Sequence, residues 1–350
     1  MQLEPSIFRA YDIRGIVKTQ LTADVALEIG KAIGSYALEK KQGTLISGKD
    51  GRLTSPNLAM ALQKGILSTG CNIIDIGLVP SPLVYFAAHT LEPHSGVMVT
   101  GSHNPPEYNG VKIMIAGSAL SADEIQMLYQ RISQQNYHHG EGTIKSLDIR
   151  PSYIEAITQQ IHFNKPPKIV IDCANGAAGV IAPELFKKLG CEVITLFEAV
   201  DGHFPNHHPD PSDPKNLIDL TEAVKNHHAD IGLAFDGDAD RLGVITNLGE
   251  NIWPDRQLIL YALDVLSRNP GATIVYDVKC SSHVASMIAA HGGNPVMWKT
   301  GHSLVKAKLK ETGALLAGEM SGHTFFKENW HGFDDAIYTA ARLLDIMVRD

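Results

Sequence analysis

Short runs of apolar, often β-branched residues alternate along this chain with longer stretches in which apolar positions recur every three or four residues. The runs have the length of strands, and the longer stretches have the period of amphipathic helices. The expected strands are 44–48, 72–77, 96–100, 111–115, 168–172, 230–235, 273–278, 295–299 and 315–319. The expected helices are 22–40, 54–70, 121–135, 151–162, 178–190, 216–228, 254–268, 281–292 and 302–312. This alternation favours an α/β fold with largely parallel sheets.

Two breaks divide the pattern into segments of ordinary domain size. The chain turns polar over residues 136–150, and turn-forming residues gather over 247–256. The predicted domains are therefore 1–150, 151–250 and 251–350. The fold expected is α/β, with three consecutive domains of mixed, largely parallel sheets sandwiched by helices and an active site in the cleft between them. A similar succession of elements in each segment hints at a repeated unit.

Composition narrows the class of protein. Hydrophobic residues make up 44% and charged residues 19%, which is typical of a globular chain. A net charge of -8 does not favour nucleic acid or an anionic membrane as partner. The sequence contains no apolar run of the roughly 18 residues that a membrane span needs, and we expect no signal peptide in MQLEPSIFRAYD. The four cysteines form no CxxC pair, which favours buried thiols in a reducing cytoplasm.

The loop TGSHNPPEYNGVKI, residues 100–113, places a hydroxyl, an imidazole and an amine close together in the sequence. These are Ser102, His103 and Lys112. The motif is not the G-x-S-x-G elbow of an α/β-hydrolase. Taken alone, it leaves three roles open for Ser102: a nucleophile, a carrier of phosphate, or a turn residue.

The stretch FDGDADR, residues 235–241, follows an apolar strand and carries carboxylates at every second position. If alternate residues face the same way, Asp236, Asp238 and Asp240 converge, and a hard divalent cation such as Mg²⁺ would offset their repulsion. An EF-hand is excluded because Arg241 replaces the required glycine and Asn247 the required glutamate. A solvated acidic turn, or a phosphatase that uses the first aspartate as nucleophile, remains open.

Five motifs in order resemble the α-D-phosphohexomutase family, in its bacterial phosphomannomutase/phosphoglucomutase branch. They span nearly the whole chain and are FRAYDIRG (8–15), TGSHNP with NGVK (100–112), DGDADR (236–241), KTGHS (299–303) and GEMSGH (318–323). The resemblance implies an enzyme that interconverts hexose 6-phosphate and hexose 1-phosphate, with Mg²⁺ as cofactor. It also implies a phosphoserine domain, a metal-binding domain and a sugar-recognition domain, in that order.

The resemblance also implies a role for each matching residue. Ser102 would carry the phosphoryl group, and the Mg²⁺ ligands would be Asp236, Asp238, Asp240 and the Ser102 phosphate. The other implied catalytic residues are Lys112, His103, Arg14 and Arg241. The implied substrate-binding residues are Tyr11, His302, Glu319, Ser321 and His323. Without the resemblance, Arg14 could simply pair with Asp12, and Lys112 could be a surface lysine.

The implied chemistry runs through phospho-Ser102 and a hexose 1,6-bisphosphate that turns around before the second transfer. The GEMSGH loop accepts mannose or glucose on this interpretation. Close family members carry a fourth, C-terminal phosphate-binding domain, and no matching loop occurs in this chain. Two alternatives therefore accompany the mutase: a metal- and phosphosugar-binding protein with little turnover, and a leaky phosphatase. The expected partner is a phosphorylated hexose, and the expected state is a cytoplasmic monomer.

Overall fold

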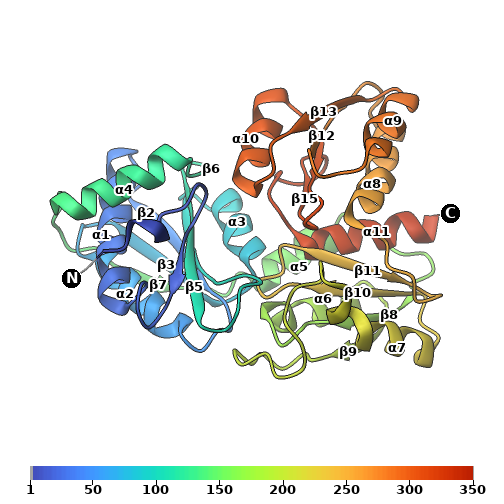
Figure 1. Ribbon diagram of the computed structural model, residues 1–350, viewed down its shortest axis with the longest axis horizontal. Coiled ribbons are helices and arrows are strands. Elements are labelled where there is room, and N and C mark those ends of the chain that lie inside the picture. The colour runs from blue at the N-terminus through green and yellow to red at the C-terminus, as the bar shows by residue number, and fades with distance from the viewer. Residues whose placement is uncertain (1–2, 350) are drawn as a thin grey trace. The chain divides into compact units, whose positions relative to one another are not determined.

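A computed structural model describes residues 3–349. Their contacts divide the chain into two compact units. The first holds the residues up to Arg150 together with 201–203, and the second holds 151–200 and the residues from Phe204 onward. The predicted α/β class is confirmed. The structure has three mixed sheets, and helices form the connections between many of their strands (Figure 1).

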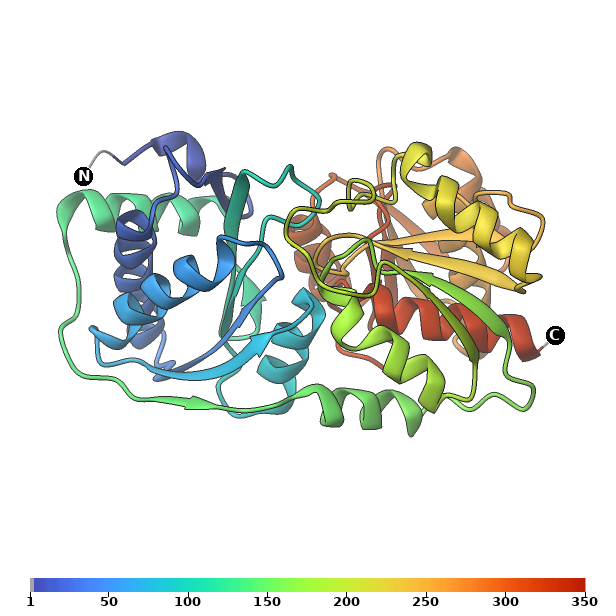
Figure 2. The same cartoon turned by 90° about the horizontal axis from the view of Figure 1, so that it is seen from below.

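The first unit is built on a seven-stranded sheet in the order β1-β5-β4-β2-β3-β7, with β6 paired to β5. Its strands are β1 (Ile13–Ile16), β2 (Thr44–Lys49), β3 (Asn72–Leu78), β4 (Gly96–Val99), β5 (Tyr108–Ile115), β6 (Ser118–Ala119) and β7 (Ile144–Ser146). Its helices are α1 (Ala23–Glu39), α2 (Ser55–Leu67), α3 (Ser81–Thr90) and α4 (Ala122–Gln134), besides a short 3-10 turn at Pro5–Ile7. The polar stretch after α4 carries β7, which extends the sheet beside β3 (Figure 2).

The helices cover both faces of this sheet. Side chains of α1, α2 and α4 share one core with strand residues such as Leu45 and Val97. On the opposite face, α3 approaches so closely that a Cβ on Gly48 or Gly96 would lie 2.6 or 2.9 Å from Val84. Glycine is thus required at both places by the fit of α3 against the sheet.

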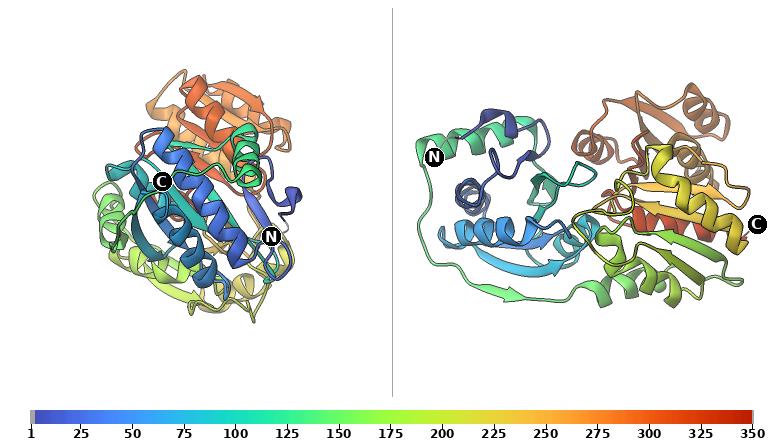
Figure 3. Two further views of the ribbon diagram at one scale, coloured as in Figure 1. Left: turned by 90° about the vertical axis from the view of Figure 1, so that its left-hand side faces the viewer. Right: turned by 60° about the horizontal axis from the view of Figure 1, so that its bottom comes forward.

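Helices α1 and α2 lie side by side in direct backbone contact (Figure 3). A Cβ on Gly30 would lie 2.1 Å from the carbonyl oxygen of Leu62, and a Cβ on Gly65 would lie 2.1 Å from that of Leu27. Larger side chains at these two positions would force the helices apart and open the core beneath them.

The second unit contains two four-stranded sheets. The first has the order β11-β10-β8-β9 and the second the order β13-β12-β14-β15. Their strands are β8 (Lys168–Asp172), β9 (Glu192–Leu196), β10 (Ile231–Phe235), β11 (Leu242–Thr246), β12 (Thr273–Asp277), β13 (Asn294–Trp298), β14 (Leu316–Gly318) and β15 (Thr324–Phe326). The helices around them are α5 (Arg150–Thr158), α6 (Ala182–Lys188), α7 (Ile218–His227), α8 (Pro254–Arg268), α9 (Ser282–Ala290), α10 (His302–Thr312) and α11 (Ala336–Arg349). The single helix expected over 178–190 is instead a 3-10 turn at Ala177–Val180 followed by α6, which has Pro183 in its first turn.

All three sheets contain four strands with the same topology. This shared topology agrees with the repeated unit that the sequence suggests. In each, the first, second and third strands of a set are parallel, and the fourth returns antiparallel beside the third. The spatial orders β5-β4-β2-β3, β11-β10-β8-β9 and β15-β14-β12-β13 are therefore equivalent. The connection from third to fourth strand is 100–107, 236–241 or 319–323. These are the three loops in which the sequence concentrates its candidate chemistry.

Asp335 binds two aromatic side chains and the backbone of a third aromatic residue inside the second unit. Its carboxylate accepts hydrogen bonds from the Tyr153 hydroxyl at 2.8 and 2.9 Å, from Trp330 Nε1 at 3.1 Å and from the Tyr338 backbone N–H at 2.9 Å. The rings of Trp330 and Tyr338 are stacked, with centroids 4.3 Å apart. This cluster fixes the start of α11 against α5.

We expect the free energy of unfolding of Asp335→Asn to increase relative to that of the parent as the pH rises. Burial raises the pKa of Asp335 to about 7 from 3.8, although its hydrogen bonds oppose that shift. Because the folded-state pKa is the higher one, the stabilising contribution is complete below about pH 4 and is lost as the pH rises to about 7. Asparagine does not ionise, so the stability of the variant relative to the parent should gain up to roughly 3 kcal/mol between about pH 5 and pH 7. Thermal unfolding at several pH values measures this.

Asp264→Asn is the matched control. Despite burial, ion pairs with Arg268 and Arg342 lower the pKa of Asp264 to about 2. A carboxylate with a lowered pKa stabilises the fold, and this contribution is lost only as the pH falls through that pKa. The Asp264→Asn variant should therefore be destabilised equally at about pH 5 and pH 8. If Asp335→Asn shows the same pH-independent difference, its carboxyl is already ionised throughout that range.

No helix among residues 3–349 combines the length and apolar character needed to cross a bilayer. The four cysteines are free thiols, and Cys71, Cys173 and Cys191 are buried. Burial raises the pKa of Cys71 and of Cys191 to about 12, which leaves these thiols protonated and unreactive.

Candidate active site

In the first unit, the predicted serine loop joins β4 to β5. Ser102 is buried and has a φ of 50°, a left-handed conformation that is uncommon for residues other than glycine. Its backbone N–H donates to Thr100 Oγ1 at 2.8 Å. Its Oγ lies 3.1 Å from His103 Nδ1, so an imidazole nitrogen is within hydrogen-bonding distance of the hydroxyl. The predicted pair of Ser102 and His103 is thus brought together.

Arg14 lies in β1 and contacts the ends of this loop. Its guanidinium pairs with Asp12 Oδ2 at 2.6 Å, as the simpler interpretation of the sequence expects. It also donates to the side-chain oxygen of Asn104 and to the carbonyl oxygen of Gly101 at 3.4 Å. Arg14 therefore supports the serine loop through both its backbone and a side chain.

The two remaining candidates of the first unit differ in exposure. Lys112 lies in β5 and is only 5% exposed, with Nζ 3.5 Å from Ser81 Oγ at the start of α3. A surface lysine is therefore excluded. Tyr11, just before β1, is 40% exposed.

In the second unit, the three carboxylates after β10 converge. Asp236, Asp238 and Asp240 are fully buried, and one oxygen from each lies within 4.8 Å of the others. The cause differs from the extended backbone that the alternation suggests. Ala239 has a φ of 57°, and Asp236 Oδ1 accepts the backbone N–H groups of Asp240 at 3.0 Å and of Arg241 at 3.2 Å, so the loop folds back on itself.

This group fits a magnesium ion. Three carboxylate oxygens held close together and away from water repel strongly, and a hard divalent cation is the usual compensation. The guanidinium of Arg241 lies beside them and interacts favourably with Asp236 and Asp240, although burial opposes its charge. Three oxygen donors of this kind are a set that a hard divalent cation such as Mg²⁺ prefers.

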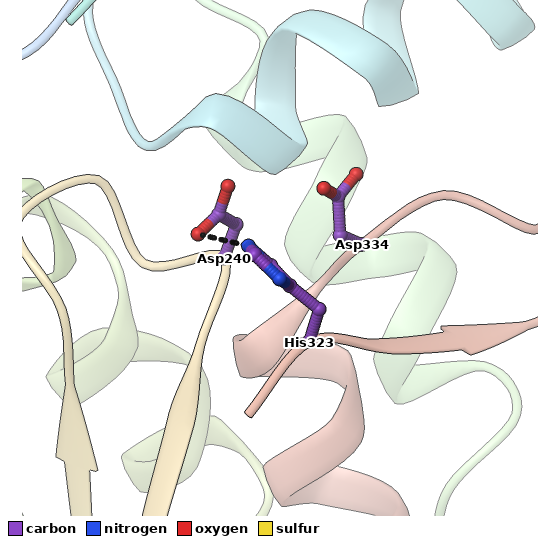
Figure 4. A group of neighbouring side chains, drawn as sticks. All are labelled: Asp240, His323 and Asp334. Carbon is purple, nitrogen blue, oxygen red and sulfur yellow. Dashed lines mark ion pairs between the residues drawn. The ribbon is translucent and has the colours of Figure 1, made fainter. Parts of the chain in front are cut away.

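The GEMSGH loop contacts this carboxylate loop directly. His323 Nε2 lies 3.2 Å from Asp240 Oδ1 (Figure 4). His323 Nδ1 lies 2.9 Å from Glu319 Oε2. Although burial disfavours a charged imidazole, Asp240 and then Glu319 outweigh it and raise the pKa of His323 to about 9. Each ring nitrogen of His323 thus lies beside a carboxylate, and Arg241 Nε lies 3.3 Å from Nε2. Ser321 Oγ lies 2.9 Å from His323 Nδ1.

His302, the first residue of α10, belongs to the same cluster. Its ring centroid is 5.6 Å from that of His323, and its Nδ1 lies 3.3 Å from Asp334 Oδ2. The KTGHS and GEMSGH loops also meet where the backbone N–H of Gly301 donates to Glu319 Oε1 at 2.6 Å. The structure thus brings together all the predicted substrate-binding residues of the second unit: His302, Glu319, Ser321 and His323.

Asp334 is a member of this cluster that the motifs do not identify. It is fully buried, and Lys306 Nζ lies 2.8 Å from its Oδ1 (Figure 4 shows Asp334 beside His323). Burial would raise the pKa of Asp334, but Lys306 and His302 hold it well below its usual range. Asp240, His323 and Asp334 also lie close enough to hold a cation, but Lys306 already supplies positive charge to Asp334. The signal in the sequence was a pair of aspartates, 334–335, within an otherwise apolar segment.

Comparison with known proteins identifies the family of the domains that contain these loops. Residues 5–139, 151–249 and 253–350 match, respectively, alpha/beta/alpha domains I, II and III of phosphoglucomutase/phosphomannomutase. A phosphomannomutase/phosphoglucomutase of Pseudomonas aeruginosa is 57% identical over 348 residues, which are 99% of this chain and 75% of that protein. A phosphoglucomutase of Neisseria gonorrhoeae is 51% identical over 97% of this chain and 75% of that protein.

A solved structure gives the same result. The crystal structure of a phosphoglucomutase/phosphomannomutase family protein from Burkholderia thailandensis superimposes with a TM-score of 0.98 at 51% identity, over 100% of this chain and 78% of that one. This chain thus spans about three-quarters of the length of these relatives. Three consecutive domain matches and relatives above half identity establish that the chain belongs to the phosphoglucomutase/phosphomannomutase family.

Proposed function

We propose that this chain is a hexose phosphate mutase that interconverts the 6-phosphate and the 1-phosphate of mannose, glucose or both. Family membership supports the reaction class. The observation that carries the proposal is the meeting of the carboxylate loop and the GEMSGH loop at His323, which joins a cation site to groups suited to sugar hydroxyls.

Ser102 is the proposed carrier of the phosphoryl group. In the first transfer, the bond between Ser102 Oγ and phosphorus breaks, and a bond forms between phosphorus and the free hydroxyl oxygen of the sugar phosphate. The hydroxyl proton leaves the sugar, and Ser102 Oγ ends the step protonated. The product is a hexose 1,6-bisphosphate, which turns around and returns its other phosphoryl group to Ser102. The burial of Ser102 supports this role, since it limits attack by water.

Proton movement is assigned to three basic side chains of the candidate site. His103 lies 3.1 Å from Ser102 Oγ and is the proposed holder of the serine proton. Lys112 is a second candidate because it is a buried amine on the strand that follows the loop. His323 is a candidate proton donor in the second unit because Asp240 and Glu319, against the opposing effect of burial, raise its pKa.

Asp236, Asp238 and Asp240 are the proposed Mg²⁺ ligands. When bound there, the cation would supply positive charge against the negative charge of the phosphoryl oxygens. Arg241 adds a fixed positive charge, and Glu319 and Ser321 offer an acceptor and a hydroxyl suited to neighbouring sugar hydroxyls. Tyr11 and His302 complete the proposed contacts to the substrate. Free, buried thiols suit a reducing compartment, and we place the protein in the cytoplasm as a monomer.

Incubation of the purified chain with Mg²⁺, hexose 1-phosphate and a catalytic amount of hexose 1,6-bisphosphate tests the function. Phosphorus NMR should show the 1-phosphate signal replaced by that of the 6-phosphate, and parallel reactions with mannose and glucose substrates give the ratio of kcat/KM. Release of inorganic phosphate alone would indicate a phosphatase. Binding of the sugar phosphate with neither product would indicate a binding protein and would contradict the proposal.

A further inference from the structure

Arg52, in the loop between β2 and α2, contacts the serine loop along most of its length. Its side chain is 1% exposed. The guanidinium donates to the carbonyl oxygens of Ser102 at 2.7 Å and Asn104 at 2.5 Å, and to those of Pro105 at 2.7 Å and Tyr108 at 3.0 Å. One side chain thus binds four backbone carbonyls, three in the loop that carries Ser102 and one at the first residue of β5.

Residues 102–107 belong to no strand or helix, and the Pro105 carbonyl also accepts the backbone N–H of Tyr108 at 3.0 Å. Ser102 is the buried residue of the four, and a buried carbonyl without a donor costs on the order of 1–3 kcal/mol. Arginine has five N–H groups in a rigid planar fork, so it can meet several acceptors at once. Lysine has a single ammonium and cannot reproduce that geometry.

Asp50 holds the other end of the same loop. Its Oδ2 accepts hydrogen bonds from Thr100 Oγ1 at 2.7 Å and from the backbone N–H of Gly101 at 3.2 Å. Thr100 Oγ1 in turn accepts the backbone N–H of Ser102. Asp50 also pairs with Arg52 Nε at 3.4 Å. The two charges offset each other, so the pair adds no net charge beside a serine proposed to carry phosphate.

The backbone is shaped to fit this pair. A Cβ on Gly101 would lie 2.4 Å from Arg52 Nε and 2.5 Å from its Cζ, so the guanidinium packs directly against the glycine next to Ser102. Ser102 itself has a positive φ, which costs on the order of 1 kcal/mol or more for a residue with a side chain and persists only where the surroundings impose it. Asp50 binds the backbone of Gly101 before Ser102, and Arg52 binds the backbone of Asn104 after it.

We infer that Arg52, supported by Asp50, is a positioning residue for the phosphoryl-carrying serine. The inference rests on the proposed function of Ser102. Arg52 touches backbone oxygens and acts through the conformation of the loop. Its loss should therefore slow transfer and let the misplaced phosphoserine react with water. Binding of the sugar phosphate, which we assign to groups in other loops, should change little.

The test compares Arg52→Lys and Arg52→Met with the parent protein. We expect kcat to fall by about 100-fold in Arg52→Met and about 10-fold in Arg52→Lys, because misplacing a reacting group by about 1 Å can cost 100-fold. KM for hexose 1-phosphate should stay within about threefold, and inorganic phosphate released per mutase turnover should rise. Arg131→Met is the matched control. It removes the ion pair of Arg131 with Glu39 on the surface of the same unit and should leave all three quantities unchanged.

Two further measurements distinguish failure of the proposed function of Ser102 from failure of the inference about Arg52. Intact mass after incubation with hexose 1,6-bisphosphate shows whether the parent acquires phosphate. If the parent does not, the proposed function fails, whatever the variants do. Amide hydrogen exchange tests positioning without phosphate: in Arg52→Lys, protection should fall in residues 100–110 and not in β8. A parent that turns over, with an Arg52→Lys variant of unchanged kcat and phosphate release, would overturn the inference, as would unchanged protection of residues 100–110. Should Arg52→Met not fold, Arg52→Lys decides.

Discussion

Ser102→Ala is expected to lose both phosphate incorporation and mutase activity while keeping its fold. The change removes only Oγ, whose hydrogen-bonding neighbour is the side chain of His103, and leaves the backbone contacts of the loop in place. Without Ser102 Oγ, the enzyme has no atom that can accept and donate the phosphoryl group. We therefore expect kcat to fall by at least about 1,000-fold. Intact mass after incubation with hexose 1,6-bisphosphate should show a heavier phosphorylated species for the parent and none for the variant.

Ser133→Ala is the control for the serine change. Ser133 lies on α4 in the same unit, and its hydroxyl donates to the backbone of Tyr129. This variant should take up phosphate and turn over as the parent does. If Ser102→Ala retains the phosphate content of the parent, another residue carries the phosphoryl group and the proposed relay is wrong.

Asp238→Asn is expected to weaken Mg²⁺ binding by at least about 100-fold. The substitution keeps the size of the side chain and removes one of three buried carboxylate charges. Mutation of a residue that only hydrogen-bonds to a metal ligand lowers metal affinity by about 10- to 100-fold. Removal of the charge of a ligand itself should lower the affinity at least as much. In the absence of Mg²⁺ the opposite effect is expected: fewer repelling charges should raise the Tm of the variant above that of the parent.

Titration of Mg²⁺ against Tm, without substrate, measures this independently of activity. The parent should be stabilised as the ion binds, because only the folded protein offers the site, and the variant should respond weakly. Asp219→Asn, an exposed carboxylate in the first turn of α7, should respond to Mg²⁺ as the parent does. An Asp238→Asn variant with the Mg²⁺ response of the parent would place the cation elsewhere.

Much of the fold could be predicted from the sequence because its strands are short and its helices amphipathic. Strands such as β8 and β10 and helices such as α1 and α8 lie within a residue or so of their predicted bounds. The predictions did not include α3 and α11. Eight of the ten residues of α3 are buried, so this helix lacks the polar stripe by which an amphipathic helix is recognised. The return strands β11 and β15 are also missing from the prediction, because they are short and directly follow the functional loops.

The candidate site could be predicted where its residues are adjacent in sequence. The spacing of the three aspartates indicated convergence, and the structure confirms it. Asp334 and Arg52 could not be assigned in the same way, because their partners lie far away in the chain: Asp334 meets Lys306, and Arg52 meets residues 102–108. The sequence signal for Arg52 was DGR, a pair of opposite charges directly after β2.

The equivalent order of strands in the three sheets has a consequence for how this protein arose. A shared order of four strands, with the chemistry always placed between the third and the fourth, is the arrangement expected from duplication of a single ancestral gene segment. Each copy then kept its scaffold and diverged at one hairpin, toward a hydroxyl, a set of carboxylates or a sugar-recognition loop. Since both ends of each hairpin are fixed in the same sheet, one activity could change while the other two were preserved.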